Sequence, residues 1–308
     1  MELSIITTLY KSEAHVRQFV ERAISAAQAS FETFEIILVD DGGPDKSASI
    51  AKELAAVDSR IVVLELSRNF GHHAAALCAI EYSRGERVFL IDSDLEVDPG
   101  KLDDFLAMMG RTGADVVYGV QQVRQGSFAS RHLGQLFWKL FNAVSDVTVP
   151  NNVMTERLMT RRYVDSLVQL GDKNLFMAGM FYWPGYSQVP LPLRKEARMS
   201  ASTYSFGKRA RLLVQAISSF SSAPLLIIFW LGLAVLAASG VYSLGLVAHR
   251  LLSPETILSG FTFLAVLLLL SFGVNLMALG VIGLYIHRIF RQVQQRPRYI
   301  VKNMTGRK

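Results

Sequence analysis

The sequence of 308 residues is poor in cysteine and lacks two familiar nucleotide-binding motifs. Its single cysteine, Cys78, allows no intrachain disulfide and suits a reducing compartment. The first apolar run continues into TTLYKSE without a GxGxxG fingerprint, and no GxxxxGK(S/T) occurs, so we expect neither a dinucleotide-dependent enzyme nor a P-loop nucleotide triphosphatase. The opening MELSIITTLYKSE has no basic start and no long apolar region, so we do not expect a signal peptide.

Acidic residues are nearly absent from the last third of the chain. Residues 206–308 carry 11 lysines and arginines but a single acid, Glu255, whereas residues 1–205 carry 21 basic and 25 acidic side chains. The formal net charge of +6 therefore comes from the C-terminal part. Because long uncharged stretches interrupt the basic residues there, nucleic-acid binding is a poor explanation for them.

Two stretches without any formal charge indicate a membrane protein. Each exceeds the roughly 20 apolar residues that a helix needs to cross a bilayer. We predict a transmembrane hairpin over residues 223–287, with spans at about 223–248 and 260–286. An amphipathic juxtamembrane segment over 206–222 would lie at the membrane surface before the hairpin, and a basic tail over 288–308 would follow it.

The basic residues around the hairpin predict its orientation. The connection between the spans offers only Arg250 and Glu255, while both outer flanks are rich in lysine and arginine. The positive-inside rule then places residues 1–205 and the C-terminal tail in the cytoplasm, with the bilayer as a partner. The flanking basic residues are Lys208, Arg209, Arg211, Arg288, Arg291, Arg296, Arg298 and Lys302.

Short apolar runs alternate with helical patterns in residues 1–205. Between the first two runs, Val16, Val20, Ile24 and Ala27 recur at helical spacing. This alternation predicts an α/β domain with a mostly parallel, Rossmann-like sheet covered on both faces, which binds ligands at the carboxyl ends of its strands. The predicted strands are Leu3–Thr8, Phe34–Val39, Ile61–Leu66, Val88–Ile91 and Val116–Val120.

Clustered carboxylates follow two of these predicted strands. LVDDGGPD ends the second strand, and IDSDLEVD ends the fourth. Carboxylate oxygens are ligands that Mg²⁺ and Mn²⁺ prefer, and both ions also take phosphate oxygens and water. The alternatives are a solvated acidic turn or a helix N-cap at the second motif, and ordinary turn chemistry at the first.

The ordered set VDDGGPD, LSRNFGHHAAAL and DSDLE resembles the family 2 glycosyltransferases with the GT-A fold. RLMTRRYVDSL, STYSFGKRARLLVQAISSFSSAPL and the closing RPRYIVKN are similar to the branch that glycosylates polyprenyl phosphates, with two C-terminal transmembrane helices. The similarity spans essentially the whole chain. A DxD motif alone is a weak signal, whereas the ordered set is specific.

The resemblance implies a metal site and a nucleotide-sugar site. Asp92, Asp94 and Glu96 would hold Mg²⁺ or Mn²⁺ together with the donor diphosphate, and Asp94 would be catalytic. An aspartate of the VDDGG motif would accept a hydrogen bond from the base of the nucleotide. The residues expected to bind the nucleotide sugar are Thr8, Tyr10, Glu13, Asp40, Asp41, Arg68, Asp92 and Ser93.

The sequence departs from the family pattern at several positions. Thr8 and Lys11 replace a usual proline and asparagine, although Glu13 is kept. Where relatives often carry GDFR this chain has MTER, so only Arg157 carries over as a catalytic candidate. A lipid phosphate is already anionic near neutral pH and needs little help from a general base, so a missing acid there is tolerable for such an acceptor.

An anionic acceptor requires cationic partners just before the membrane. Arginine suits phosphate oxygens because its planar guanidinium offers paired donors. The residues expected to bind the lipid phosphate are Arg194, Arg198, Ser202 and Tyr204, with Arg198 also catalytic and Arg157 and Arg161 as further candidates.

The resemblance thus implies inverting transfer of one sugar, UDP-glucose being the first choice of donor, to undecaprenyl phosphate, and the charge distribution places this at the cytoplasmic face of a bacterial inner membrane. The product would be a lipid-linked sugar for cell-envelope glycan or lipid modification, and the resemblance implies a homotetramer. One alternative is a catalytically degenerate nucleotide-sugar-binding scaffold. The other is a processive polysaccharide synthase, although the QxxRW motif of those enzymes is absent.

Overall fold

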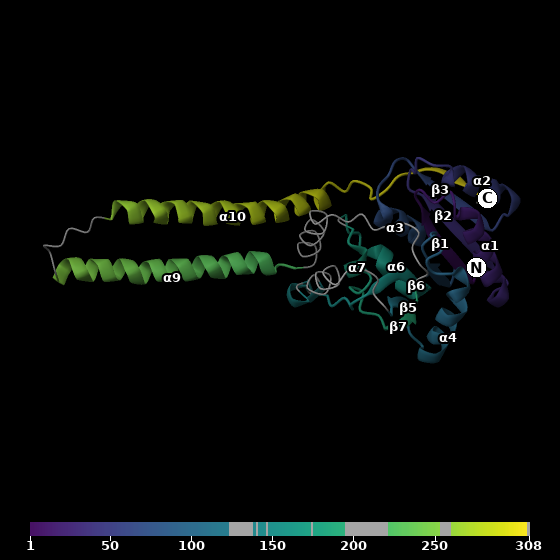
Figure 1. Cartoon of the computed structure of the whole chain (residues 1–308), viewed down its shortest axis with the longest axis horizontal. Helices are drawn as coiled ribbons and strands as arrows, with labels where there is room; N and C mark the ends of the chain where they lie inside the picture. The colour runs from purple at the N-terminus through teal and green to yellow at the C-terminus, as the bar shows by residue number, and fades with distance from the viewer. Residues whose placement is uncertain are drawn as a thin grey trace.

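The computed structural model describes residues 1–122, 138–139, 141–145, 147–173, 175–194, 221–252 and 260–306. Helices pack on a sheet to form one domain, from which two long helices extend side by side (Figure 1). The last strand lies back in the domain, so the chain leaves the domain for the long helices and then returns to it.

The described strands form one eight-stranded sheet in the order β7-β5-β6-β4-β1-β2-β3-β8. Its centre is parallel, because β1 pairs with β2 and β4, and β2 pairs with β3, all in parallel. Strand β7 is parallel to β5, while β6 is antiparallel to β4 and β5, and β8 is antiparallel to β3. The predicted mostly parallel sheet is therefore confirmed. The strands are β1 (Leu3–Leu9), β2 (Phe34–Asp40), β3 (Ile61–Leu66), β4 (Arg87–Leu90), β5 (Val116–Gln121), β6 (Val153–Thr160), β7 (Gln188–Leu193) and β8 (Val301–Thr305).

Helices cover both faces of the sheet and create two hydrophobic clusters. Apolar side chains of α3, α6 and α7 pack in one cluster, and those of α1, α2 and α4 pack in the other. The helices are α1 (Val16–Ser30), α2 (Ser47–Val57), α3 (His72–Tyr82), the 3₁₀ turn η1 (Pro99–Lys101), α4 (Leu102–Thr112), α6 (Arg161–Gln169) and α7 (Met177–Met180).

Strand β2 shows why the central strands are continuous apolar runs. All of its residues are buried, with Ile37 and Val39 in one cluster and Ile36 and Leu38 in the other. A strand covered on both faces needs apolar side chains on both faces.

Three described strands lie outside the five that the sequence predicted. Strand β6 fits antiparallel between β4 and β5, and β7 extends the sheet beyond β5. Strand β8 comes from residues assigned to the basic tail over 288–308, so this tail is in part an edge of the domain sheet.

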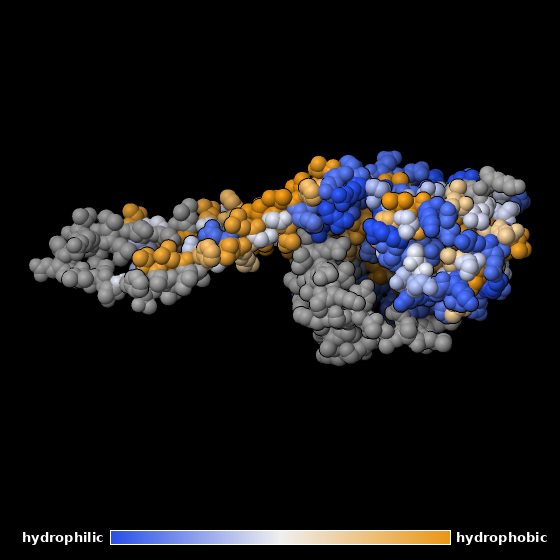
Figure 2. All heavy atoms as spheres, turned by 90° about the horizontal axis from the view of Figure 1, so that it is seen from above, coloured by the Kyte–Doolittle hydropathy of each residue, from blue (hydrophilic) through white to orange (hydrophobic). Residues whose placement is uncertain are grey.

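Helices α9 (Ala223–Leu252) and α10 (Phe261–Val293) are long and apolar enough to cross a membrane, by length and composition, within Ala223–Tyr242 and Ser271–Val293. Their described apolar side chains are largely exposed, and Figure 2 shows hydrophobic residues along the helical extension. Helix α10 continues past the predicted end of the second span at residue 286. Most of the predicted amphipathic segment, over 206–220, lies outside the described residues.

The return of the chain from α10 is fixed by contacts with α3. Arg298 forms an ion pair with Glu81, and both side chains are largely buried. The hydroxyl of Tyr299 donates to the same carboxylate, and the N–H of Ser67 donates to the carbonyl of Ile300 at 2.9 Å. The C-terminal end of α10 is therefore held against the domain immediately before β8.

Gly85 offers a test of how closely β1 and the turn before β4 approach. A Cβ at this position would lie 2.4 Å from the backbone nitrogen of Ser4 and 2.7 Å from the carbonyl oxygen of Arg87. We expect Gly85→Ala to lower the free energy of unfolding by about 1–3 kcal/mol, because backbone atoms must move to admit the methyl group. The measurement is the thermal unfolding midpoint of the full chain in detergent.

Gly110→Ala is the matched control. This residue is exposed in α4, and a Cβ there meets nothing within 4 Å. Alanine should stabilise the helix by about 0.5–1 kcal/mol. Equal midpoints for the two variants would contradict the close approach at Gly85.

Candidate active site

The carboxyl ends of β1, β2 and β4 meet at one edge of the sheet. The parallel register pairs Leu9 with Asp40 and Ile6 with Leu90. The residues that follow β4, Asp92 and its neighbours, therefore lie beside Thr8, with β1 between them and the end of β2. The two acidic motifs that the sequence singled out thus lie at the same edge of the sheet, on either side of β1.

Neighbouring side chains in the loop after β4 differ in exposure. Ser93 is buried, and its hydroxyl donates to the carbonyl of Thr8 at 3.0 Å. Asp94 is exposed, and one of its carboxylate oxygens accepts from the N–H of Glu96 at 3.0 Å. Leu95 between them has φ of 60°, a left-handed conformation that is uncommon for a leucine. Such strained residues occur at sites where the surrounding structure holds a loop in one shape.

Two carboxylates of this loop are the candidate ligands for a divalent cation. Asp92 is partly exposed and Asp94 is exposed, and their binding of a metal ion stays a prediction. Within the described ranges, no three His, Cys, Asp or Glu side chains are arranged to hold one ion together. Two protein oxygens supplemented by phosphate oxygens and water are an ordinary arrangement for Mg²⁺. Glu96 is buried, and its role as a third ligand stays a prediction.

Asp40 and Asp41 are both buried but make different contacts. The two carboxylate oxygens of Asp41 accept from the N–H groups of Phe70 and Gly71, at 2.7 and 2.9 Å. Asp41 thereby ties the end of β2 to the loop that begins α3. Asp40 accepts from the N–H of Gly43 at 3.3 Å. Of the two, Asp40 is the better placed to accept a hydrogen bond from a nucleotide, although both assignments stay predictions.

The motif NFGHH, which was part of the family resemblance, supplies a residue that received no role from the sequence. The ring Nδ1 of His72 lies 3.0 Å from the hydroxyl of Thr8, and its Nε2 lies 3.9 Å from a carboxylate oxygen of Asp92. His72 is the first residue of α3, which places it over the ends of β1 and β4. Only the spatial neighbourhood of α3 and β4, which the sequence does not show, could have linked His72 to Asp92.

Three other predicted donor-binding residues line the outer rim. Tyr10 is 48% exposed beyond the end of β1. The carboxylate of Glu13 accepts from the N–H of Lys46 at 3.2 Å, which fixes the start of α2. The guanidinium of Arg68 lies over the ring of Phe70, 4.1 Å from its centroid. Their contact with a nucleotide sugar stays a prediction.

Arg157 is fully buried in β6, opposite Leu90 of β4. Its guanidinium lies over the ring of Phe181, 3.3 Å from the centroid, and donates to the carbonyls of Thr155 and Met154 at 3.0 and 3.1 Å. Burial lowers the pKa of this guanidinium, while nearby tyrosines and Glu156 act in the opposite direction. Arg157, His72 and His73 line one cavity of about 140 Å³, which places this cation close to the Asp92 loop.

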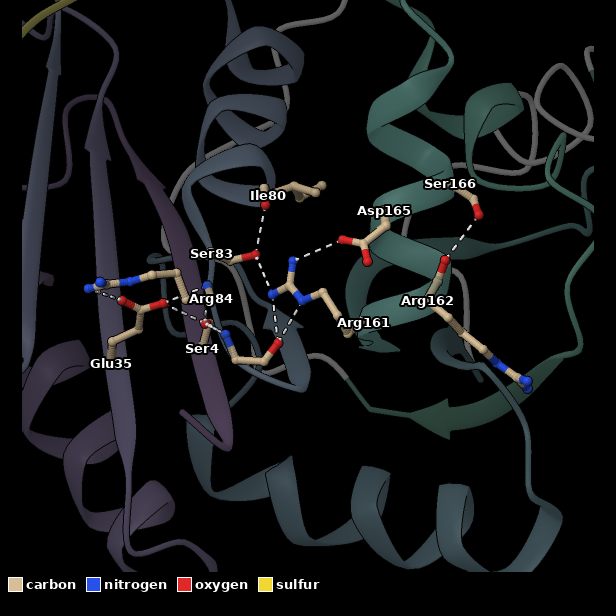
Figure 3. A network of polar contacts seen from close by, with 10 residues as sticks. Ser4, Glu35, Ile80, Ser83, Arg84, Arg161, Arg162, Asp165 and Ser166 are labelled. Carbon is tan, nitrogen blue, oxygen red and sulfur yellow. Dashed lines mark hydrogen bonds and ion pairs between the residues drawn. The ribbon is translucent and has the colours of Figure 1, made fainter.

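Arg161 does not belong to this site, so its prediction as a phosphate-binding residue is wrong. Its guanidinium donates to the carbonyl of Gly85 at 2.6 and 2.9 Å and lies 3.6 Å from Asp165 (Figure 3). Gly85 precedes β4, whereas the aspartates follow β4, so the two sites lie about 20 Å apart along the strand. Arg161 instead ties the start of α6 to the opposite end of the sheet.

The predicted lipid-phosphate set is only partly described. Arg194 is exposed after β7, and its Nε donates to the amide oxygen of Gln122 at 3.2 Å. Arg198, Ser202 and Tyr204 lie outside the described residues.

Comparisons with known proteins identify the family of the chain. Residues 4–168 match Glycosyl transferase family 2. The chain is 37% identical over 306 residues to a protein of Mycobacterium tuberculosis named among putative glycosyltransferases, covering 99% of this chain and 89% of that one. It is 31% identical over 305 residues to the bactoprenol glucosyl transferase of Shigella phage SfV, covering 98% of this chain and 99% of the other. A solved structure of glucosyl-3-phosphoglycerate synthase from M. tuberculosis is similar with a TM-score of 0.49 and 19% identity, over 71% of this chain and 79% of that one.

The α/β fold, together with the sequence match, defines a glycosyltransferase. The chain belongs to glycosyltransferase family 2, and the expected family resemblance is confirmed. It is accordingly a transferase with an α/β domain of this family, followed by two membrane-capable helices.

The burial of Asp40 generates a pH-dependent prediction. Burial raises the pKa of Asp40 above its ordinary 3.8, against the opposing effect of the backbone N–H groups of Gly43 and Gly42. The folded protein therefore binds this proton more tightly than the unfolded chain does, and the ionised form costs stability at neutral pH. We expect Asp40→Asn to be the more stable protein near pH 7, with an advantage that shrinks as the pH falls through the raised pKa.

The measurement is the difference in unfolding midpoint between the wild type and Asp40→Asn, followed from pH 7 to pH 4 with EDTA present. Other carboxyl groups titrate in both proteins and cancel in the difference. An advantage of Asp40→Asn that grows on acidification would show that the pKa of Asp40 is lowered instead.

Proposed function

We propose that this glycosyltransferase moves a single sugar from a nucleotide sugar, UDP-glucose as the first choice, to a polyprenyl phosphate such as undecaprenyl phosphate. The observation that carries the proposal is the placement of Asp92 and Asp94 on an open sheet edge in a chain that continues into two membrane-capable helices. Similarity to bactoprenol glucosyl transferases over nearly the whole length supports the same acceptor class.

The donor would lie across the ends of β1, β2 and β4. Asp40 would accept a hydrogen bond from an N–H of the base, and the rim residues Tyr10 and Arg68 would contact the nucleotide. Thr8 is held by His72 at 3.0 Å, which fixes the edge of the site nearest Asp92. Because Asp41 already binds the loop before α3, its contribution to donor binding would be indirect.

Negative charge develops on the departing diphosphate when the bond to the anomeric carbon breaks. Mg²⁺ or Mn²⁺ bound by Asp92 and Asp94 supplies electrostatic stabilisation of that charge. The hydroxyl of the buried Ser93 donates to the Thr8 carbonyl, and this contact would hold the loop that carries the two flanking carboxylates. Glu96 donates its N–H to Asp94 and so holds this carboxylate in place.

The acceptor phosphate attacks as an anion and needs no strong base. We propose that Arg194, Arg198, Ser202 and Tyr204 bind this phosphate, with Arg198 and Arg157 near the reacting atoms. Family resemblance supports inversion of the anomeric centre. The replacement by Thr155 of the aspartate that relatives carry in GDFR is consistent with an acceptor that is already ionised.

We also propose where in the cell the enzyme acts. The basic residues flanking α9 and α10 support a cytoplasmic catalytic domain and tail on a bacterial inner membrane, and family resemblance supports a homotetramer. The lipid-linked sugar would then serve cell-envelope glycan or lipid modification.

Asp94→Asn tests the proposed function. We expect transfer to fall by at least about 100-fold, because the neutral amide binds the divalent cation poorly and charge on the diphosphate loses its stabilisation. The assay incubates membranes containing the full chain with labelled UDP-glucose and undecaprenyl phosphate, and it scores label in the organic phase. Other nucleotide sugars, assayed in parallel, identify the donor.

Asp104→Asn is the matched control, since Asp104 is an exposed carboxylate of α4 that pairs only locally with Lys101. Its turnover should equal that of the wild type, and membrane insertion of both variants should be intact. Full turnover of Asp94→Asn, or of the wild type in excess EDTA, would overturn the metal-dependent reaction.

A further inference from the structure

A second cavity lies between the start of α3 and the chain that follows α10. Its volume is about 620 Å³, within the range of ordinary ligand sites. Three separate segments form its walls: the loop between β3 and α3, the residues around Lys173, and the last turn of α10 with the linker to β8. The cationic side chains that line it are Arg68, Lys173, Arg291, Arg296 and Arg298.

Basic side chains predominate around this cavity, and Asp172 near Arg298 and Asp41 near Arg68 are neighbouring carboxyl groups outside its lining. Among the described residues that line it there is no carboxylate. Glu81 is already engaged by Arg298 and by the hydroxyl of Tyr299. Basic side chains that converge on a cavity with no carboxylate in its described lining favour an anionic ligand that supplies several oxygens.

The cavity walls are fixed in place by hydrogen bonds. The side chain of Gln292 in α10 accepts from the N–H of Lys173 at 3.0 Å. A ring nitrogen of His73 lies 3.3 Å from the carbonyl of Leu175. Helix α3 also directs its N-terminus, the positive end of its dipole, toward the same space, since Gly71 and His72 line the cavity.

The position of the cavity relates it to the membrane. The apolar window of α10 ends at Val293, and Arg291 lies in its last turn. Figure 2 shows hydrophilic surface where the helical extension reaches the domain. The cavity therefore opens at the level where the chain leaves its candidate span, which is where lipid phosphate groups lie.

We propose that this cavity is a second phosphate-binding site, which adjoins the metal-dependent donor site. Arg68 and His72 are shared with the candidate active site, whereas Lys173, Arg291, Arg296 and Arg298 belong to parts of the chain that the proposed reaction does not use. The ligand is a phosphate group, carried by an anionic lipid headgroup or by a soluble phosphate compound. The proposal does not depend on the identity of the sugar or of the acceptor.

The test uses the double variant Lys173→Gln and Arg296→Gln in the full chain. Neither side chain forms an ion pair with another described residue, so the fold should be retained, which the unfolding midpoint checks. The matched control is Lys101→Gln with Arg111→Gln, two exposed basic residues of the η1–α4 segment. All proteins are kept in EDTA, so that phosphate does not bind through a metal ion.

Two probes distinguish the sources of the phosphate. Inorganic pyrophosphate is titrated by calorimetry into protein in phosphatidylcholine nanodiscs, and phosphatidic acid is compared with phosphatidylcholine by native mass spectrometry of detergent-purified protein. We expect the wild type and the control to bind at least one probe, with affinity about tenfold or more above that of the double variant, because two charge-assisted contacts are lost.

Selective retention of phosphatidic acid assigns a lipid ligand, and binding of pyrophosphate alone assigns a soluble one. Equal binding by the wild type and the double variant, or no binding of either probe by the wild type, overturns the site. Sugar transfer by wild-type membranes is scored separately, so failure of this site and failure of the proposed function give different results.

Discussion

The parallel pairing of β1 with β2 and β4 is the constraint on which the rest of the site depends. Main-chain hydrogen bonds fix the register, and the register brings Thr8, Asp40 and Asp92 to one edge from positions far apart in the sequence. Asp92 remains partly exposed at this edge because the strands end there, while the helices that cover the faces exclude water from the apolar residues below. Neither acidic motif alone would form the site.

Asp41 extends this constraint to the helix layer. By accepting from Phe70 and Gly71 it joins the end of β2 to the start of α3, and His72 then lies between Thr8 and Asp92. Gly42 permits the close approach, because a Cβ there would lie 2.7 Å from the carbonyl carbon of Arg68. Asp41 was predicted to bind the nucleotide, and in the structure it positions the loop before α3.

The central fold was predictable because both faces of β1, β2 and β3 are buried, and such strands are continuous apolar runs. Strand β6 was not predictable in this way. It contains Glu156 and Arg157, which look like surface residues in the sequence but are buried in the structure. Two contacts join segments that are far apart in the sequence: Arg157 lies over Phe181, and His72 approaches Asp92. The spacing of these residues along the chain does not predict that they meet. The end of α10 and strand β8 also required the three-dimensional pairing with β3.

Strand β8 has a mechanical consequence for the whole enzyme. It covers the free edge of β3, which would otherwise offer unpaired backbone groups to another chain. Residues 294–300 between α10 and β8 span at most about 25 Å when fully extended. The contacts of Arg298 and Tyr299 with Glu81 fix part of this connection to the domain and so shorten the segment that can move. The catalytic domain is therefore held close to the C-terminal end of α10, and the short connection between them limits how far one can move relative to the other.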